Sequence, residues 1–237
     1  HLRQPAQVER RTLGRSGIEV APLALSGAHD LPFEAYAQAR RAGVDLFFWE
    51  PGYRNLTRFL RSRAGREARV VAGTYHADEE GVRHDVEVAR RRLRRDRLDV
   101  FLYFWARSSA RVTPAAFELL ARLREEGALA ACGFSSHDRE LARCALLASP
   151  WDVLMTRHSA AHPKAERELF PLAEERGVGV LTFSATCYGR LLQRVPEGDE
   201  PLTPAECYGY SLAQPAVAAD PGPPARPATA GPPPRGP

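Results

Sequence analysis

Short apolar runs alternate with stretches of helical periodicity from residue 22 onward, and this alternation restricts the fold more than any other feature of the chain. Successive runs lie roughly 20–30 residues apart, which leaves room for one helix between them. The expected strands are 22–26, 46–49, 69–74, 99–104, 129–134, 153–157 and 178–183. The expected helices lie near 33–42, 56–63, 82–95, 114–126, 139–147 and 165–176. Strands that alternate with helices indicate a parallel sheet, either closed or doubly wound.

Several predicted elements have chemically marked ends. Thr113 and Pro114 have the residue types of a helix N-cap followed by a first helical position, and Gly127 and Gly177 are suited to end helices. Before the first strand, residues 11–20 form two short runs around a glycine turn, which predicts a hairpin. After the last, Thr203 and Pro204 predict a short helix that runs to about residue 214.

The basic residues are almost all arginine, since Lys164 is the one lysine among 33 Lys and Arg, and the formal net charge is +4. The densest basic run, residues 90–95, could attract nucleic acid. However, the apolar residues of 82–93 recur at helical spacing, so the arginines are expected on the exposed face of an amphipathic helix. No aromatic residues for base stacking are interleaved with them. We therefore predict no nucleic-acid partner.

The chain contains no apolar run of the ~18–20 residues that a membrane span needs, and the first residues lack the apolar stretch of a signal peptide. We therefore expect a cytoplasmic protein without a membrane partner. Four widely spaced cysteines without a Cys-x-x-Cys pair favour reduced thiols. His158 and His162 have the spacing of a helical zinc pair, but Pro163 disfavours a helix there, so no metal site is expected.

Four segments resemble the aldo-keto reductases. These are RTLGRSGIEVAPLALSG from residue 11, GVDLFFWEPGY from residue 43, and GALAACGFSS from residue 127, followed by RHSAAHPKAERELFP after the sixth strand. The resemblance covers roughly residues 10–219. It implies a (β/α)8 TIM barrel whose N-terminal hairpin closes the bottom, with a small-molecule site at the C-terminal ends of the strands.

Aromatic residues and histidines concentrate at those strand ends, which predicts one pocket. Its expected wall consists of His29, Trp49, Tyr75, Phe104 and Trp105. Its expected acids and bases are Glu50, Tyr53, His76, His137 and His158.

The family reduces carbonyls with NADPH by means of a tyrosine, an aspartate, a lysine and a histidine. If one residue is missing from the loop after residues 47–48, Tyr53 matches the tyrosine and Trp49 stands at the aspartate position. Tyr75 then stands at the lysine position and Phe104 at the histidine position. With three of four positions replaced, ordinary carbonyl reduction is not expected, because loss of one such electrostatic element already costs about 10²–10³ in rate.

The resemblance also assigns cofactor positions. Ser136 and Met155 stand where the family has amide side chains that bind the nicotinamide, whereas Phe183 keeps the aromatic ring that stacks on it. The phosphate-binding loop after the eighth strand has no counterpart. We therefore expect no NADPH, or weak NADPH binding.

Three functions remain open. The first is proton transfer of the isomerase or lyase type on a small molecule, the second is an atypical NADPH-dependent oxidoreductase, and the third is a non-catalytic binding or regulatory subunit.

The end of the chain limits barrel closure. Residues 220–237 contain eight prolines and three glycines, so we expect a barrel domain over 1–219 and a disordered proline-rich tail over 220–237. Only residues 215–219 remain for the eighth strand, which is expected to be short or missing, with the seam covered poorly, by a partner chain or by the tail lying across it. An open edge would favour self-association.

Overall fold

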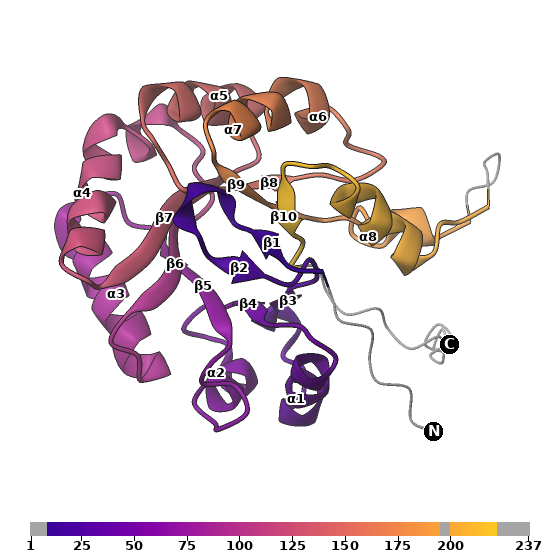
Figure 1. Cartoon of the computed structure of the whole chain (residues 1–237), viewed down its shortest axis with the longest axis horizontal. Coiled ribbons are helices and arrows are strands. Elements are labelled where there is room, and N and C mark those ends of the chain that lie inside the picture. Colours follow the sequence, from indigo (N-terminus) through magenta and orange to yellow (C-terminus); the bar gives the residue numbers. More distant parts are fainter. Residues whose placement is uncertain (1–8, 195–199, 222–237) are drawn as a thin grey trace, which may run out of the picture.

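The structure is a computed structural model that describes residues 9–194 and 200–221. Eight parallel strands lie side by side in the order β10-β9-β8-β7-β6-β5-β4-β3, and the sheet curls with its helices on the outside (Figure 1). The strands are β3 (Leu25–Ser26), β4 (Leu46–Phe48), β5 (Arg69–Thr74), β6 (Leu98–Tyr103), β7 (Leu129–Ser136), β8 (Val153–Arg157), β9 (Gly179–Phe183) and β10 (Val217–Ala219). This confirms the predicted (β/α)8 barrel with a short eighth strand.

Helices connect the successive strands along the chain. They are α1 (Phe33–Arg41), α2 (Arg54–Leu60), α3 (Glu79–Leu93), α4 (Pro114–Glu125), α5 (Arg139–Ala148), α6 (Ala165–Glu168), α7 (Phe170–Glu175) and α8 (Pro204–Leu212), with single turns η1 (Gly14–Ser16), η2 (Gly27–His29), η3 (Ser109–Arg111) and η4 (Arg190–Leu192). The expected caps are confirmed. The Thr113 side chain accepts a hydrogen bond from the Ala116 N–H, and Gly127 and Gly177 follow their helices with positive φ angles of 83° and 62°.

One expected helix, 165–176, is in fact two. The break lies at Leu169, whose φ and ψ of −126° and −41° are not helical, and Pro171 occupies the first turn of α7. A proline within a continuous helix would lack one N–H donor and clash with the carbonyl four residues earlier. The chain avoids both costs by starting a new helix there.

Two apolar clusters hold the barrel together. The inner cluster fills the barrel and contains the side chains of Leu46, Val71, Val100, Val153 and Leu181. The outer cluster lies between strands and helices and contains their strand neighbours, such as Phe47, Phe101 and Val180. Because successive side chains of a strand point to opposite faces, these clusters tell which residues face the barrel interior.

The N-terminal end of the barrel is closed by the predicted hairpin, formed by β1 (Arg11–Thr12) and β2 (Glu19–Val20). Figure 1 looks onto this hairpin as it crosses the barrel end. Its apolar residues Leu13, Ile18 and Val20 belong to the inner cluster. Any site within the barrel must therefore open at the opposite, C-terminal end.

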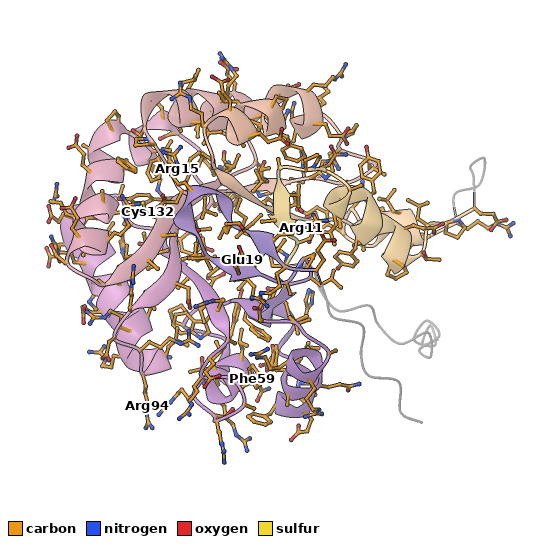
Figure 2. The ribbon with its side chains drawn as sticks, viewed as in Figure 1. Arg11, Arg15, Glu19, Phe59, Arg94 and Cys132 are labelled. Atoms are coloured by element: carbon orange, nitrogen blue, oxygen red, sulfur yellow. The ribbon has the colours of Figure 1, made fainter. Side chains whose placement is uncertain are left out.

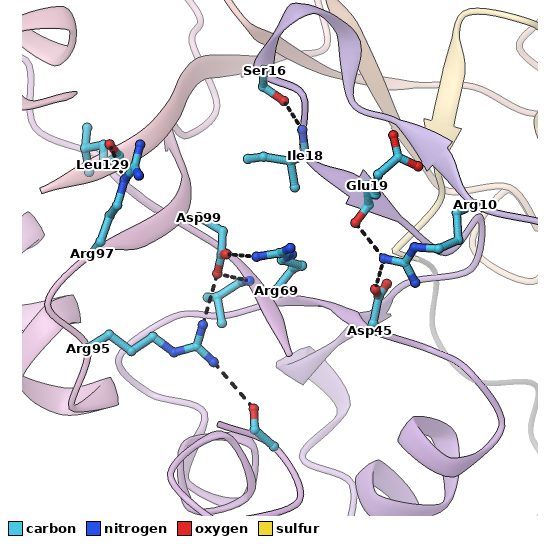
Figure 3. A network of polar contacts seen from close by, with 12 residues as sticks. Arg10, Ser16, Ile18, Glu19, Asp45, Arg69, Arg95, Arg97, Asp99 and Leu129 are labelled. Carbon is cyan, nitrogen blue, oxygen red and sulfur yellow. Dashed lines mark hydrogen bonds and ion pairs between the residues drawn. The ribbon is translucent and has the colours of Figure 1, made fainter. Parts of the chain in front are cut away.

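Buried and half-buried carboxylates join the elements at this closed end (Figure 3). Asp99 accepts hydrogen bonds from Arg69 at 3.2 Å, from Arg95 at 3.0 Å and from the Val70 N–H at 3.0 Å. Asp45 accepts one from the Ala21 N–H at 2.8 Å and forms an ion pair with Arg10. These charges therefore fasten strands and hairpin rather than form a ligand site.

The first residue of the expected tail, Asp220, covers the seam, which is one of the three arrangements that the sequence left open. The Ala24 N–H donates to the Asp220 carbonyl, and the Asp220 N–H donates to the Pro22 carbonyl, both at 3.0 Å. Asp220 is fully buried and its carboxylate accepts a hydrogen bond from Thr182 at 2.9 Å. Asp220 thus extends the eighth strand and closes the barrel, so the fold continues past residue 219. The predicted disordered tail begins at Asp220, and its residues 222–237 lie outside the described residues.

Arg91, Arg92 and Arg94 of the basic run 90–95 are exposed, as the helical periodicity predicts, whereas Arg95 is mostly buried beyond the end of α3. The residues of α3 that are buried are the expected apolar ones, Val82, Val86, Ala89 and Leu93, while Arg94 points away from the barrel (Figure 2). Within the described part of the chain, no helix is long and apolar enough to cross a membrane.

Candidate functional site

The open end of the barrel, called the mouth here, is floored by aromatic side chains. Phe48 and Phe104 extend the inward faces of β4 and β6, and their ring centres are 4.9 Å apart. The Tyr75 ring lies 5.6 Å from Phe104, and Phe183 packs against the inner cluster at the end of β9. The floor is therefore apolar, with Tyr75 half-exposed above it.

Glu50 stands at one side of the mouth between two tyrosines. The Tyr53 hydroxyl donates to Glu50 Oε1 at 2.9 Å, and the Tyr75 hydroxyl donates to Oε2 at 3.4 Å. Burial, and next the charge of Glu50, raise the pKa of both tyrosines above the ordinary value. Both hydroxyls therefore stay protonated and act as donors near neutral pH. The structure brings together Tyr53, Glu50, Tyr75 and Phe104, as the sequence predicts.

Two local features hold this group in place. The backbone of Gly27, just after β3, lies so close to the Tyr53 ring that a Cβ atom there would overlap it. Arg111, which sequence reasoning missed, donates to the carbonyls of Phe104 at 2.8 Å, and of Thr74 and His76 at 3.2 Å. It thereby ties the ends of β5 and β6. Arginine near a strand end carries no sequence signal for such backbone contacts.

The opposite side of the mouth carries His137, Phe183 and Arg157. The rings of His137 and Phe183 are 4.9 Å apart, and that of exposed Trp105 lies 6.4 Å from His137. Arg157 pairs with Phe183 in the β8–β9 ladder, so both side chains share the inward face. Burial, with a smaller effect of Arg157, lowers the pKa of His137.

Three residues that the sequence places in the pocket lie elsewhere, which corrects their expected positions. Trp49 is buried in the outer cluster, where its Nε1 donates to Thr57 at 2.8 Å. His76 Nδ1 lies 3.0 Å from Asp85 of α3, away from the mouth. Trp49 directly follows the inward-facing Phe48, and a neighbour in an extended chain points to the other face. Phe48 takes the inward place that the sequence analysis gave to Trp49.

His158 is the third such residue, and it follows inward-facing Arg157. It is fully buried behind the sheet, stacked on Tyr210 with ring centres 5.4 Å apart. Its Nδ1 lies 2.9 Å from Ser211 Oγ and its Nε2 lies 2.9 Å from Glu166 Oε1. The network fastens α8 to α6. His158 therefore has no access to the mouth.

His29 is exposed in η2, after β3. His162, in the loop after β8, faces Ser159 Oγ at 3.2 Å through Nδ1. No group of three His, Cys, Asp or Glu side chains suited to a metal comes together in the described ranges. The pair His158 and His162 therefore has no third ligand there.

The assigned nicotinamide positions do not fit that group. The Ser136 hydroxyl is buried, donates to the Ala106 carbonyl at 2.9 Å and accepts from the Asp138 N–H at 3.1 Å. Met155 lies in the inner cluster and has no amide to offer. Inward-facing Ser135 already accepts a hydrogen bond from the Trp105 N–H at 2.7 Å. Of the positions assigned to the nicotinamide, Phe183 is the one that lies at the mouth. The segment after residue 221 lies outside the described residues.

A shallow hollow of about 850 Å³ lies beside the mouth, between the loop after β6 and the start of α5. Arg107, Arg139, Arg143 and Arg167 line it together with Trp105 and His137. It is outside the barrel, so it does not contain the Glu50 group.

Comparisons with known proteins agree with this architecture. An NADH-specific methylglyoxal reductase of Escherichia coli (strain K12) is 28% identical over 114 residues, 47% of this chain and 35% of that protein. The chain thus aligns with about a third of that relative's length. An aldo-keto reductase from Bacillus halodurans in its holo form superposes with a TM-score of 0.74 at 19% identity, covering 91% of this chain and 86% of that one. A glycerol dehydrogenase from Gluconobacter oxydans gives a TM-score of 0.67 at 19% identity, with 90% and 85% covered.

These structural similarities concern the fold. The model of the aldo/keto reductase family, in contrast, matches the sequence itself over residues 57–216, from α2 to the residue before β10. A match over most of the barrel decides the family. The chain belongs to the aldo/keto reductase family.

Proposed function

We propose that the mouth catalyses proton transfer on a small carbonyl compound, with Glu50 as the general base. The observation that carries this proposal is the carboxylate of Glu50 between the hydroxyls of Tyr53 and Tyr75. Neither the lysine nor the histidine position of the reductases holds a cation, because Tyr75 and Phe104 occupy them.

The geometry supports different roles for Tyr53 and Tyr75. The shorter bond from Tyr53 holds one carboxylate oxygen, whereas the longer one from half-exposed Tyr75 leaves Oε2 accessible. Glu50 would take a proton from the carbon next to the substrate carbonyl. Tyr75 would donate a hydrogen bond to the enolate oxygen that forms, since its raised pKa keeps the hydroxyl protonated. Where the deprotonated carbon carries a hydroxyl, transfer of the hydroxyl proton to the enolate oxygen and return of the abstracted proton to the former carbonyl carbon would complete an isomerisation. Loss of a leaving group, with its bonding electrons, from the carbon next to the deprotonated one would instead complete an elimination.

Proton exchange in D₂O tests the proposal. Hydroxyacetone and dihydroxyacetone are incubated with the protein, and deuterium incorporation at the carbon next to the carbonyl is followed by NMR. Glu50→Gln should slow incorporation by about 10²–10⁴-fold, the usual contribution of a general base. Glu34→Gln, on the exposed face of α1, is the matched control and should exchange like the wild type. Unchanged exchange in Glu50→Gln would refute the assignment.

An NAD(P)H-dependent reductase is the second candidate, favoured by the family and by the similarity to the methylglyoxal reductase. Tyr53 and Phe183 lie at the mouth as that chemistry requires. We expect no NADPH binding or weak binding, since Ser136 and Met155 provide no free amide. Calorimetry that gives a dissociation constant of about 1 μM or below, with methylglyoxal-dependent oxidation of NADPH or NADH, would favour the reductase instead.

Ligand binding with neither exchange nor cofactor oxidation would identify a non-catalytic binding protein, the third function open from the sequence. The cytoplasmic location and self-association expected from the sequence stay predictions. Sedimentation of the purified chain tests self-association.

A further inference from the structure

Arg157 is a partly buried arginine without a polar partner among the described residues. It ends β8 on the inward face, two residues beyond Met155 of the inner cluster and beside Phe183 in the ladder. Its side chain forms no hydrogen bond or ion pair with residues 9–194 or 200–221. Three partly buried arginines elsewhere in the barrel differ, since Arg69 and Arg95 both contact Asp99 and Arg111 contacts backbone carbonyls. An arginine that faces a site and lacks an acceptor is suited to bind an anionic ligand.

Several basic side chains lie near Arg157. His137 stacks edge-on against Phe183, next to Arg157. Burial and then Arg157 lower the pKa of His137 and also that of His162, for which Arg139 and Arg190 contribute further. Nearby Glu168 is already paired with Arg139. Two further carboxylates, which line the neighbouring hollow with His137, are also engaged, Glu140 with Arg143 and Asp138 with the Leu141 N–H.

We infer that Arg157 binds the carboxylate of a short-chain keto or aldehydo acid at the mouth. Its planar guanidinium can donate two parallel hydrogen bonds to a carboxylate. His137 and Phe183 would cover one side of the ligand. This inference names the substrate class of the proposed function. It rests on that function only for the carbonyl end of the ligand, on which Glu50 would act.

The barrel limits the length of such a ligand. β4, which precedes Glu50, and β8 are separated by three strands in either direction around the closed barrel, so they lie opposite each other. Opposite strands of an eight-stranded barrel are about 15 Å apart. Arg157 lies on the inward face of β8, and Glu50 accepts a hydrogen bond from Tyr75, which follows β5. A ligand that touches both must therefore be short, with its carbonyl only a few bonds from its carboxylate.

Calorimetric binding of pyruvate and of its uncharged methyl ester tests the inference. Wild-type protein should bind pyruvate more tightly than the ester. Arg157→Gln should weaken pyruvate binding by about 10–100-fold, the range for loss of a charge-assisted hydrogen bond, and should leave ester binding unchanged. Arg143→Gln is the matched control, because Arg143 is exposed and already paired with Glu140. Arg157→Lys should retain part of the affinity, and equal thermal unfolding of all variants verifies the fold.

Two outcomes would overturn the inference: equal binding of pyruvate and its ester by the wild type, or unchanged pyruvate binding by Arg157→Gln. Inorganic phosphate that binds as tightly as pyruvate would also overturn the assignment to a carboxylate. The Glu50→Gln variant separates the two proposals. It should lose proton exchange and keep pyruvate binding, so pyruvate binding without exchange in the wild type would leave the anion site standing and refute only the proposed function.

Discussion

At the residue scale, Tyr53 depends on the absence of a side chain at Gly27. A Cβ atom at Gly27 would overlap the Tyr53 ring and approach Leu56, so Gly27→Ala should displace the tyrosine and break its hydrogen bond to Glu50. We expect slower deuterium exchange and a loss of about 1–3 kcal/mol of stability from overpacking. Gly52→Ala is the control, because nothing lies within 4 Å of a Cβ there. Denaturant unfolding and the exchange assay measure both effects, and equal activity of the two variants would contradict the prediction.

The histidines near Arg157 supply a second prediction at this scale. Burial, followed by the charge of Arg157, holds the pKa of His137 below its ordinary value. The folded state therefore binds a proton at His137 less readily than the unfolded chain does. The contribution of His137 to the free energy of unfolding is complete above about pH 6.5 and is lost as the pH falls below that value. Removal of one cation in Arg157→Gln should raise the pKa of His137 and His162. NMR titration of the ring protons measures this, and unchanged values would show that Arg157 is remote.

At the scale of elements, Asp99 joins two strands and the end of a helix. It accepts hydrogen bonds from Arg69 and the Val70 N–H of β5, and from Arg95 just after α3 (Figure 3). Arg95 is mostly buried, and burial lowers its pKa. Asp99→Ala should therefore cost about 3–5 kcal/mol, because it leaves that charge without its partner. Asp96→Ala, at an exposed neighbouring position, should change stability by less than about 0.5 kcal/mol. Chemical denaturation compares them, and similar losses in both would contradict the prediction.

At the scale of the whole molecule, few backbone hydrogen bonds close the barrel between β10 and the start of the sheet. The backbone bonds of Asp220 to Pro22 and Ala24 join β10 to the start of the sheet, whereas β5, β6 and β7 pair over longer segments. Hydrogen exchange should therefore be faster at the amides of Ala24 and Asp220 than at those of β6, because opening the seam breaks few bonds. Mass spectrometry or NMR can measure this. Equal protection at the seam and in β6 would show that the barrel opens only by global unfolding.

Local sequence determined the elements and one side of the site. Apolar periodicity, the Thr113 cap and the glycine stops place most helices and strands, because those signals act within a few residues. The short spacing from Glu50 to Tyr53 also brings those side chains to one strand end. In contrast, the sequence left open how the seam is covered, since only the tertiary structure pairs Asp220 with residues 22–24.

Tertiary structure alone decided which strand residues face the mouth. Parallel barrel strands are buried on both faces, so their sequences are apolar throughout and do not reveal which alternate residues point inward. The run from Val153 to Arg157 has no alternation of polarity except at its end. For that reason the sequence predicts Trp49 and His158 at the mouth although they face outward, and it does not identify Phe48 and Arg157, which face inward. Curling of the sheet around the inner cluster makes one face interior, and that choice depends on every strand at once.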